Sequence, residues 1–379
     1  MRGAIYLDNA ATSWPKPPAV ASSMKSCIDS FCANPGRGNH KMAIKCAEAV
    51  YSVREKICNM FGGPSPENVV FTQNATYALN TAIKSLVPSG HVIISDIEHN
   101  AVVRPVVSSG LKYSIFSSRC EEKNLLREAE AHIESNTRAM IVNAASNICG
   151  IKLPLEKLGE ICSRHGLIFI VDASQAAGKQ EIDMKKCRID ALCAPGHKGL
   201  LGPQGTGFVI FSERAAKVCT RSRTLIEGGN GVNSRDAFMP DFLPERYEAG
   251  TLNVPAIVGL GEGLSFVRAL GVEKIAREED SLGAQMTRYL KTMKGITVYA
   301  EEQKPSSVVL FNIDGMNSED AAKALDSHGI YVRAGLHCAP LAHSTLGTPE
   351  TGAVRISFGV FNSFEDAART AEVINAIKR

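Results

Sequence analysis

Short apolar runs alternate with helical stretches between about residue 68 and residue 212. The candidate strands are Asn68–Thr72, His91–Ser95, Lys112–Phe116, Ala139–Ala144, Leu167–Asp172, Ile189–Ala194 and Gly207–Phe211. The run Leu167–Val171 is apolar at every position, as expected of a strand that is covered on both faces. Helical stretches, such as Ala75–Ser85 and Pro154–His165, fill several of the gaps. The pattern predicts an α/β domain with a mainly parallel sheet.

The pattern changes after Glu227–Pro255, a long stretch rich in glycine, proline and asparagine. Loops of this length in a compact domain are usually functional or lie at an interface. Beyond it the predicted elements are the helices Ala256–Leu270, Glu278–Met293 and Ser318–Ser327, the strands Ser307–Asn312, Ile330–Arg333 and Val354–Phe358, and a C-terminal helix. Because 379 residues exceed what one core usually organises, this mixed pattern predicts a second, smaller α+β domain.

Charge and cysteine usage exclude several classes of protein. The net charge of +3 is spread along the chain without a Lys/Arg run, so we expect no nucleic-acid partner. No apolar stretch approaches membrane-spanning length and no signal segment is evident, so we expect no membrane partner. The 11 cysteines are odd in number and lack CxxC spacing, which indicates neither a disulfide framework nor a zinc ribbon. Free thiols suit a reducing compartment, and we expect a cytoplasmic protein without a bound metal.

Three groups with distinct chemistry follow predicted strands. Asp172 closes Leu167–Val171, Lys198 comes shortly after Ile189–Ala194, and Thr76 begins the helix after Asn68–Thr72. Ligands of open α/β sheets bind at the carboxyl ends of the strands, and a helix start favours a phosphate. An amine, a carboxylate and a phosphate site are what pyridoxal 5'-phosphate (PLP) requires. Each group alone has an ordinary structural explanation, but the combination in this order indicates PLP.

A series of ordered motifs resembles the class V aminotransferase family of fold type I PLP enzymes, in its cysteine desulfurase and selenocysteine lyase branch. The motifs are Tyr6-Leu-Asp-Asn-Ala-Ala-Thr12, Asn34-Pro-Gly-Arg-Gly-Asn-His40, Asn74-Ala-Thr76, Glu98-His99, Ser146-Asn147, Val171-Asp-Ala-Ser-Gln175, Gly196-His-Lys198, Tyr247-Glu-Ala-Gly-Thr-Leu-Asn253, Arg333-Ala-Gly-Leu-His-Cys338 and Val354-Arg-Ile-Ser357. The resemblance implies a large PLP-binding α/β domain of residues 16–255 and a small α+β domain of residues 1–15 and 256–379. The active site would then lie between the domains at the interface of a homodimer.

The same resemblance implies roles for individual residues. Lys198 would bind PLP as a Schiff base, Asp172 would pair with the pyridine nitrogen, and His99 would stack on the ring and relay a proton. Gln175 and Asn147 would lie near the phenolic oxygen. The phosphate ligands would be Ala75 through its N–H, Thr76, His197 and, across an obligate homodimer, Thr251. Arg355, together with Asn147 and Arg333, would bind the substrate, because a guanidinium fork matches a carboxylate.

Cys338 is the residue that separates a desulfurase from other members of the family. It follows Arg333-Ala-Gly-Leu-His337 in a glycine-containing loop, whereas we expect the other cysteines to lie in apolar runs. A nucleophilic thiolate needs exposure and nearby positive charge, which Arg333 and His337 could supply. The implied reaction takes sulfur from L-cysteine, releases L-alanine and leaves a persulfide on Cys338 for a sulfur-acceptor protein or small thiol. Arg355 follows Cys338 by only 17 positions, which resembles the SufS-like group with a short cysteine loop and an accessory protein.

Several alternatives stay open at this point. Cys338 could be a structural thiol in another class V enzyme, or the protein could act on L-selenocysteine as a lyase. His337, Cys338 and His343 could bind a metal, although their spacing matches no common zinc pattern. The protein could also bind PLP as a catalytically idle scaffold.

Some site residues have alternatives of their own. His99 and His197 could be capping or packed histidines, and Arg355 could lie on an edge strand in contact with water. Pro195 stands where the family usually has a hydroxyl residue that contacts the phosphate. Because proline offers neither a hydroxyl nor an N–H, we expect one phosphate contact to be missing.

Overall fold

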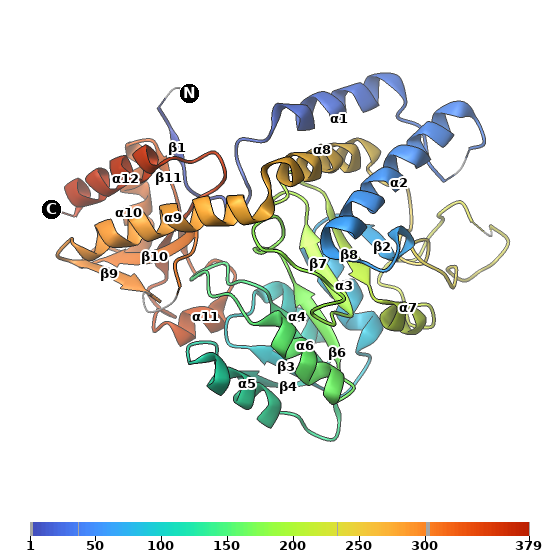
Figure 1. Ribbon diagram of the computed structural model, residues 1–379, viewed down its shortest axis with the longest axis horizontal. Coiled ribbons are helices and arrows are strands. Elements are labelled where there is room, and N and C mark those ends of the chain that lie inside the picture. The colour runs from blue at the N-terminus through green and yellow to red at the C-terminus, as the bar shows by residue number, and fades with distance from the viewer. Residues whose placement is uncertain (1–2, 37, 233, 301–303, 379) are drawn as a thin grey trace.

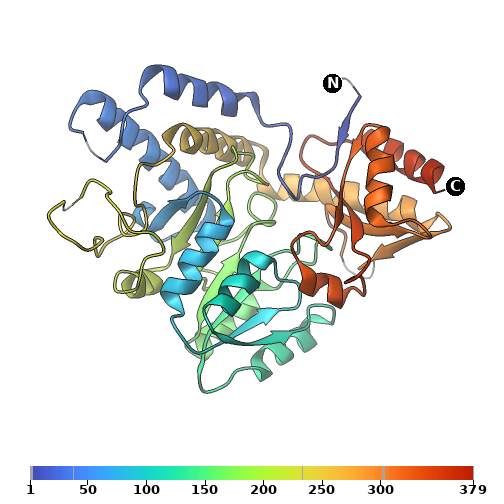
Figure 2. The ribbon, with the colours of Figure 1, turned by 180° about the vertical axis from the view of Figure 1, so that it is seen from behind.

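The central feature of the fold is a seven-stranded sheet with helices on both faces (Figures 1 and 2). The computed structural model describes residues 3–36, 38–232, 234–300 and 304–378. The strands are β2 (Val69–Thr72), β3 (His91–Ser95), β4 (Lys112–Phe116), β5 (Thr137–Asn143), β6 (Ile168–Asp172), β7 (Ala191–Pro195) and β8 (Gly207–Phe211). Their order is β2–β8–β7–β6–β5–β3–β4, and β8 runs antiparallel to both neighbours while β3 to β7 pair in parallel. The predicted α/β fold with a mainly parallel sheet is confirmed.

Strict alternation of side chains explains why both faces of this sheet are covered. In β5, Met140 and Val142 point into one apolar core while Ala139 and Ile141 point into the other. The first core is completed by α2 (Lys41–Phe61), α5 (Glu122–Ala131), α6 (Leu155–Arg164) and α8 (Val254–Leu270). The second is completed by α3 (Ala75–Leu86), α4 (Asn100–Ser108) and α7 (Glu213–Cys219). Figure 1 shows α5 and α6 in front of the sheet, and Figure 2 shows α3 and α4 on the opposite side.

A second, smaller part of the molecule combines the first described residues with the C-terminal third of the chain. Its antiparallel sheet has the order β12 (Arg333–Gly335), β13 (Ala353–Ser357), β10 (Val308–Ile313) and β9 (Ile296–Tyr299). A parallel pair, β1 (Ile5–Tyr6) and β11 (Ile330–Tyr331), lies beside it, and the helices are α9 (Val272–Lys291), α10 (Ser318–Ser327), α11 (Pro340–Thr345) and α12 (Phe364–Ile377). Both ends of the chain therefore lie in this part (Figure 1).

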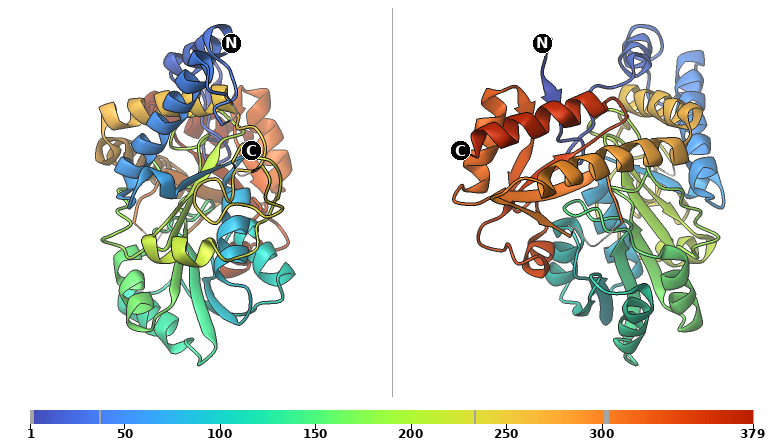
Figure 3. Two further views of the ribbon diagram at one scale, coloured as in Figure 1. Left: turned by 90° about the vertical axis from the view of Figure 1, so that its right-hand side faces the viewer. Right: turned by 60° about the vertical axis from the view of Figure 1, so that its left-hand side comes forward.

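The packing of α8 differs from the predicted domain boundary. The prediction starts the small domain at residue 256, but Leu260 and Leu264 of α8 belong to the core of the large sheet. The helix lies against α1 (Pro18–Ser30) and α2, so the change of packing comes at Gly271, where α8 and α9 meet at 81°. Figure 3 shows α9 extending from this bend into the smaller part. No single described helix is long and apolar enough to cross a membrane, although the bent pair α8 and α9 passes on length and composition alone.

One predicted strand is divided in the structure. Ile330–Arg333 was expected as a single strand, but β11 pairs with β1 whereas β12 pairs with β13. The division lets the chain pass between two sheets within a few residues. It brings Arg333 opposite Arg355 of β13, because these two residues are partners in the register of the antiparallel pair.

Candidate active site

A cavity at the carboxyl ends of β5, β6 and β7 brings most of the predicted cofactor residues together. Its empty volume is about 520 Å³, and the predicted residues that line it are Ala75, Thr76, His99, Asn147, Asp172, Gln175, His197 and Lys198. Sequence reasoning did not assign Asn74, Asn143 or Ser174, which also line it. The sequence contained a signal for two of these residues. Asn143 ends β5 and Ser174 comes two positions after the end of β6, and both strands end at the edge of the sheet where the cavity lies.

Lys198 lines this cavity, and its side chain is partly buried. Its burial lowers the pKa of the amine to about 8, an effect opposed by the charge of Asp172 and reinforced by the charges of Arg355, Arg333 and Lys179. The backbone is held as well, because Ser13 Oγ donates a hydrogen bond of 2.9 Å to the carbonyl oxygen of Lys198. A lysine with a lowered pKa supplies a neutral amine, which is the form that forms a Schiff base and accepts a proton.

Asp172 ends β6 and presents its carboxylate to the same cavity. The side chain is buried, and Oδ1 accepts a hydrogen bond of 2.8 Å from the Ser174 backbone N–H. This bond fixes the rotamer while the carboxylate stays available as a counter-charge for a cationic ring nitrogen. The charge of Asp172 also acts on His99, whose pKa burial lowers and Asp172 raises.

The start of α3 forms a site suited to a phosphate. Asn74 caps the helix, because its Oδ1 accepts a hydrogen bond of 3.1 Å from the Tyr77 N–H. Ala75 and Thr76, the first residues of α3, line the cavity, where the helix dipole favours an anion. A Cβ on Gly207 of β8 would lie 2.6 Å from the Asn74 carbonyl carbon, so only glycine allows this strand to pass so close to the helix start.

His197 supplies a side chain that fits the same anion. Burial lowers its pKa to about 4, and the charges of Lys198 and Lys16 act in the same direction, so the imidazole is neutral at pH 7. Its Nδ1 is buried and has no hydrogen-bond partner among the described residues. A buried polar atom without a partner is costly, so a phosphate oxygen here would remove an unfavourable feature. Pro195 also lines the cavity, without a donor of its own.

A hydrogen bond to the backbone orients each of three further cavity residues, His99, Gln175 and Asn147. His99 caps α4, because its Nδ1 accepts a bond of 3.0 Å from the Ala101 N–H; the capping explanation and the position in the cavity are both correct. Gln175 Nε2 donates to the Ala10 carbonyl at 2.9 Å, and Asn147 Nδ2 donates to the His337 carbonyl at 2.9 Å. Asn147 Oδ1 is buried without a partner in the described part of the chain.

Arg355 is buried in β13, which lies between β12 and β10, so the alternative of an edge strand in contact with water is wrong. Its Nη1 donates to the Asn147 carbonyl at 2.9 Å and its Nη2 to Asp8 Oδ1 at 2.6 Å. The Nε atom has no partner among the described residues. Burial lowers the pKa of Arg355, and the Asp8 carboxylate opposes this effect. Sequence reasoning missed Asp8, which lies 347 positions away from its partner.

Cys338 is exposed in the turn between β12 and α11, close to the cavity. His337 and Cys338 have φ values of +50° and +57°, a left-handed conformation that is uncommon for residues other than glycine. The Asn100 N–H, next to His99, donates to the Cys338 carbonyl at 2.8 Å, and Arg333 Nη2 lies 4.0 Å from Sγ.

One expectation about the other cysteines is wrong. Cys32 is exposed as well, because it follows the end of α1 in a loop instead of an apolar run.

The two histidines near Cys338 form a stacked pair instead of facing the thiol. His337 Nδ1 and His343 Nε2 are 3.2 Å apart, and His343 Nδ1 lies 2.8 Å from Thr348 Oγ1. Burial lowers the pKa of His337 to about 2, so its ring adds no positive charge beside the thiol at neutral pH. Among the described residues no group of three His, Cys, Asp or Glu side chains is arranged to hold a metal.

Thr251 lies outside this cavity. It is exposed in the loop before α8, where Asn34 Nδ2 donates to Thr251 Oγ1 at 3.2 Å. The two motifs that contain Asn34 and Thr251 are thus neighbours, while Arg37 lies outside the described residues. The predicted role of Thr251 in another subunit stays a prediction.

The fold and the cavity together define a fold type I PLP enzyme, and the chain belongs to the aminotransferase class-V family, whose model matches residues 5–369. This family uses PLP, so the predicted cofactor is confirmed. The buried amine of Lys198, the carboxylate of Asp172 and the unpartnered Nδ1 of His197 fit this group.

Individual relatives are similar along nearly the whole chain. A probable cysteine desulfurase of Methanothermobacter thermautotrophicus is 30% identical and covers 100% of this chain and 95% of its own length. A probable cysteine desulfurase of Pyrococcus abyssi is 32% identical and covers 96% of this chain and 91% of its own length. Among solved structures, the apo cysteine desulfurase from Thermococcus onnurineus has a TM-score of 0.89 at 30% identity, over 99% of this chain and 94% of the other.

Proposed function

We propose that this chain is a PLP-dependent L-cysteine desulfurase, which releases L-alanine and leaves a persulfide on Cys338. The observation that carries the proposal is the position of the Cys338 turn. The backbone of His337 and Cys338 is bonded to Asn147, which lines the cavity, and to Asn100, the neighbour of His99. An exposed thiol, which does not itself line the cavity, is therefore held through its backbone next to residues that do, in a cavity that contains an amine and a carboxylate. The similarity to probable cysteine desulfurases supports this reading.

Each side chain would have a distinct part in the reaction. Bound PLP would act as the electron sink for the substrate Cα. Asp172 would hold the ring nitrogen protonated, and the buried Lys198 amine would take the proton from the substrate Cα. Arg355 would hold the substrate carboxylate through its guanidinium, with Nε still without a partner.

Cys338 would complete the sulfur transfer. Its thiolate would attack the sulfur of the bound cysteine, so that an S–S bond forms while the carbon–sulfur bond breaks. The electron pair of the broken bond stays with the three-carbon product, which leaves as L-alanine after protonation. Arg333, with Nη2 4.0 Å from Sγ, favours the thiolate form that this attack requires.

The partners beyond L-cysteine are part of the same proposal. The persulfide would pass to an acceptor protein or small thiol, for which the exposure of Cys338 is a requirement. The protein would act as a homodimer in which Thr251 reaches the phosphate of the other subunit, because this exposed loop residue lies outside the cavity of its own chain. The free state of the cysteines supports a reducing, cytoplasmic location, which cell fractionation tests.

The decisive test compares wild type with Cys338→Ala, and uses Cys32→Ala as a control because Cys32 is the second exposed cysteine. Purified protein is incubated with PLP and L-cysteine, alanine and sulfide are assayed, and borohydride reduction followed by peptide mass spectrometry locates the PLP adduct. We expect the adduct on Lys198 in all three proteins, and alanine from wild type and Cys32→Ala alone. Equal alanine formation by Cys338→Ala would overturn the sulfur role of Cys338, and turnover restricted to L-selenocysteine would indicate a selenocysteine lyase.

A further inference from the structure

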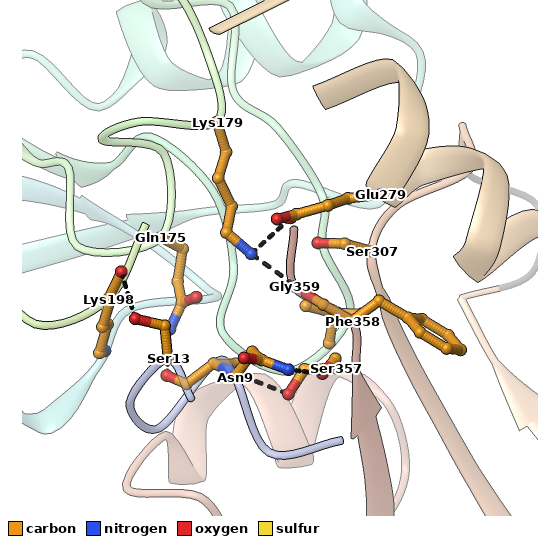
Figure 4. A network of polar contacts seen from close by, with 12 residues as sticks. Asn9, Ser13, Gln175, Lys179, Lys198, Glu279, Ser307, Ser357, Phe358 and Gly359 are labelled. Carbon is orange, nitrogen blue, oxygen red and sulfur yellow. Dashed lines mark hydrogen bonds and ion pairs between the residues drawn. The ribbon is translucent and has the colours of Figure 1, made fainter. Parts of the chain in front are cut away.

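A buried ion pair joins the two parts of the molecule beside the candidate active site (Figure 4). Lys179 Nζ lies 2.6 Å from Glu279 Oε2, and the two side chains are 15% and 4% exposed. Lys179 comes from the turn that follows β6, whereas Glu279 lies on α9. Lys179 Nζ also donates to the carbonyl oxygen of Phe358 at 3.3 Å, one residue beyond the end of β13. A single ammonium group thus contacts two elements of the smaller part.

The turn that carries Lys179 rests directly on the segment that carries Lys198. Gly178 has φ of +81°, and a Cβ there would lie 2.3 Å from the carbonyl oxygen of Gly199, the residue after Lys198. A Cβ on Gly199 would in turn lie 2.3 Å from the Ala177 carbonyl oxygen and 3.1 Å from Lys179 Cγ. The two segments leave no room for a side chain between them, so a displacement of Lys179 is transmitted to the backbone beside Lys198.

Lys179 also contacts the strand that carries Arg355. Phe358, which accepts the bond from Lys179, follows Arg355 by three positions in the chain. Beside it, Ser357 Oγ accepts a bond of 2.9 Å from the Ala10 N–H, and the Ala10 carbonyl accepts from Gln175 at 2.9 Å. Figure 4 shows Gln175, Ser357 and Phe358 around the Lys179–Glu279 pair. The Lys179–Glu279 pair therefore connects the segment that carries Lys198 with the strand that carries Arg355.

The charge of each partner depends on the other. Burial raises the pKa of Glu279, and the Lys179 ammonium opposes that rise. Apart from Lys179 Nζ at 2.6 Å, Glu279 Oε2 has no partner among the described residues, so the lysine is the compensation for burying this atom. Removal of one partner of a buried ion pair leaves an uncompensated buried charge, whereas removal of both often has little effect on stability. The charge of Lys179 also contributes to the lowered pKa of Lys198.

We propose that Lys179 and Glu279 are positioning residues, which set the placement of the Arg355 strand relative to the Lys198 segment and so align the substrate carboxylate with the amine. The role rests on the proposed desulfurase function for the identity of its substrate. The effect of the ion pair on the placement of the two segments does not depend on the substrate, so it is measured on the protein without substrate.

The test uses Lys179→Met, the conservative Lys179→Arg and the double variant Lys179→Met/Glu279→Leu. Lys152→Met is the matched control, because Lys152 forms an ion pair of 2.7 Å with Asp280, the neighbour of Glu279, but is 39% exposed. Backbone hydrogen exchange is measured by mass spectrometry on the PLP-free proteins, in segments 196–199 and 353–359. KM and kcat for L-cysteine are then measured on the PLP-loaded proteins.

We expect Lys179→Met to exchange faster in both segments and to raise KM at least about tenfold, with a smaller change in kcat. Lys179→Arg should retain most of the wild-type behaviour, and Lys152→Met all of it. If Lys179→Met is unfolded along its whole length, the double variant tests the proposal in its place, because it leaves no buried charge unpaired. We expect this variant to be folded, with faster exchange in the two segments and a raised KM.

Wild-type exchange and KM in the folded single or double variant would overturn the proposal. A wild-type protein that makes no alanine from L-cysteine would instead overturn the proposed function, while the exchange measurement would still test the pair.

Discussion

At the scale of single residues, the active site is a set of groups whose burial sets their protonation. Desolvation lowers the pKa of Lys198 to about 8 and that of His197 to about 4, so both side chains lack a full positive charge near pH 8. Arg355 retains a carboxylate partner, Asp8, in the same region. This arrangement provides a neutral amine beside a cation that can bind a carboxylate, which an amino-acid substrate requires.

The pKa of Lys198 leads to a prediction about the PLP-free protein. Between pH 8 and 10.5 the unfolded chain binds a proton at this lysine that the folded chain does not, so the folded state gains stability as pH rises through this window. We expect Lys198→Met to stabilise the PLP-free protein at pH 7 by up to about 3 kcal/mol, and the gain to shrink toward pH 10.5. Urea unfolding over this pH range measures it, with exposed Lys84→Met as the control. A gain that is constant with pH would contradict the prediction.

A second prediction at this scale concerns Arg355. Lysine would keep the charge at this position, but its ammonium is a single point and lacks the planar fork whose separate nitrogens reach Asn147 and Asp8 and leave Nε for a carboxylate. We therefore expect Arg355→Lys to raise KM for L-cysteine at least about tenfold, with a smaller effect on kcat. Steady-state kinetics measures both constants, and an unchanged KM with a large fall in kcat would argue against carboxylate binding.

At the scale of elements, the approach of β8 to the start of α3 determines the phosphate site. Gly207→Ala would place a Cβ 2.6 Å from the Asn74 carbonyl carbon and displace the start of the helix. We expect this variant to bind PLP at least about tenfold more weakly than wild type, because the N–H groups of α3 would no longer point at the phosphate. Titration of PLP-free protein gives the dissociation constant. Gly228→Ala is the control, because its Cβ would lie 3.7 Å from Ala249, an ordinary contact.

The elements also show what the sequence could predict. β3, β4 and β8 begin and end at the predicted residues. In β3 and β8 an apolar run defines a buried strand, whereas β4 is a partly exposed strand at the edge of the sheet. The partner of α8 could not be predicted, because a helix that is apolar on most sides indicates burial but not the surface against which it packs. The division of Ile330–Arg333 between two sheets depends on pairing with Ile5 and Arg355, which local sequence does not contain.

Some residues of the candidate site could likewise be predicted from the sequence, and others could not. Asp172 and Lys198 are predictable because strand ends converge at one edge of the sheet. The Arg355–Asp8 and Lys179–Glu279 pairs were not predicted, because their partners come together only when the two parts of the molecule pack.

At the scale of the whole molecule, the proposed homodimer predicts that two defective chains restore each other. Lys198→Ala removes the amine of a chain's own cavity, and Thr251→Asp would place a negative charge at the phosphate of the other subunit. A mixed dimer then has one site with both residues intact. We expect co-expressed variants to form alanine when each variant alone does not at limiting PLP. Complementation would be absent if Thr251 served the cavity of its own chain, and light scattering checks that each variant is dimeric.

The pairing of β1 with β11, and of Asp8 with Ser357, has a consequence for the synthesis of this protein. A ribosome makes residues 5–13 more than 300 residues before their partners at 330 and 357. The strands of the large sheet are complete by residue 211, and α8, which completes one of its two cores, ends at Leu270, so this part can fold on the ribosome before the partners of residues 5–13 are made. An unfinished chain would thus already carry Lys198, Asp172 and the start of α3, yet lack Cys338 and Arg355. The chain's own cofactor-binding side chains are therefore synthesised before the thiol and the guanidinium that the sulfur transfer would need.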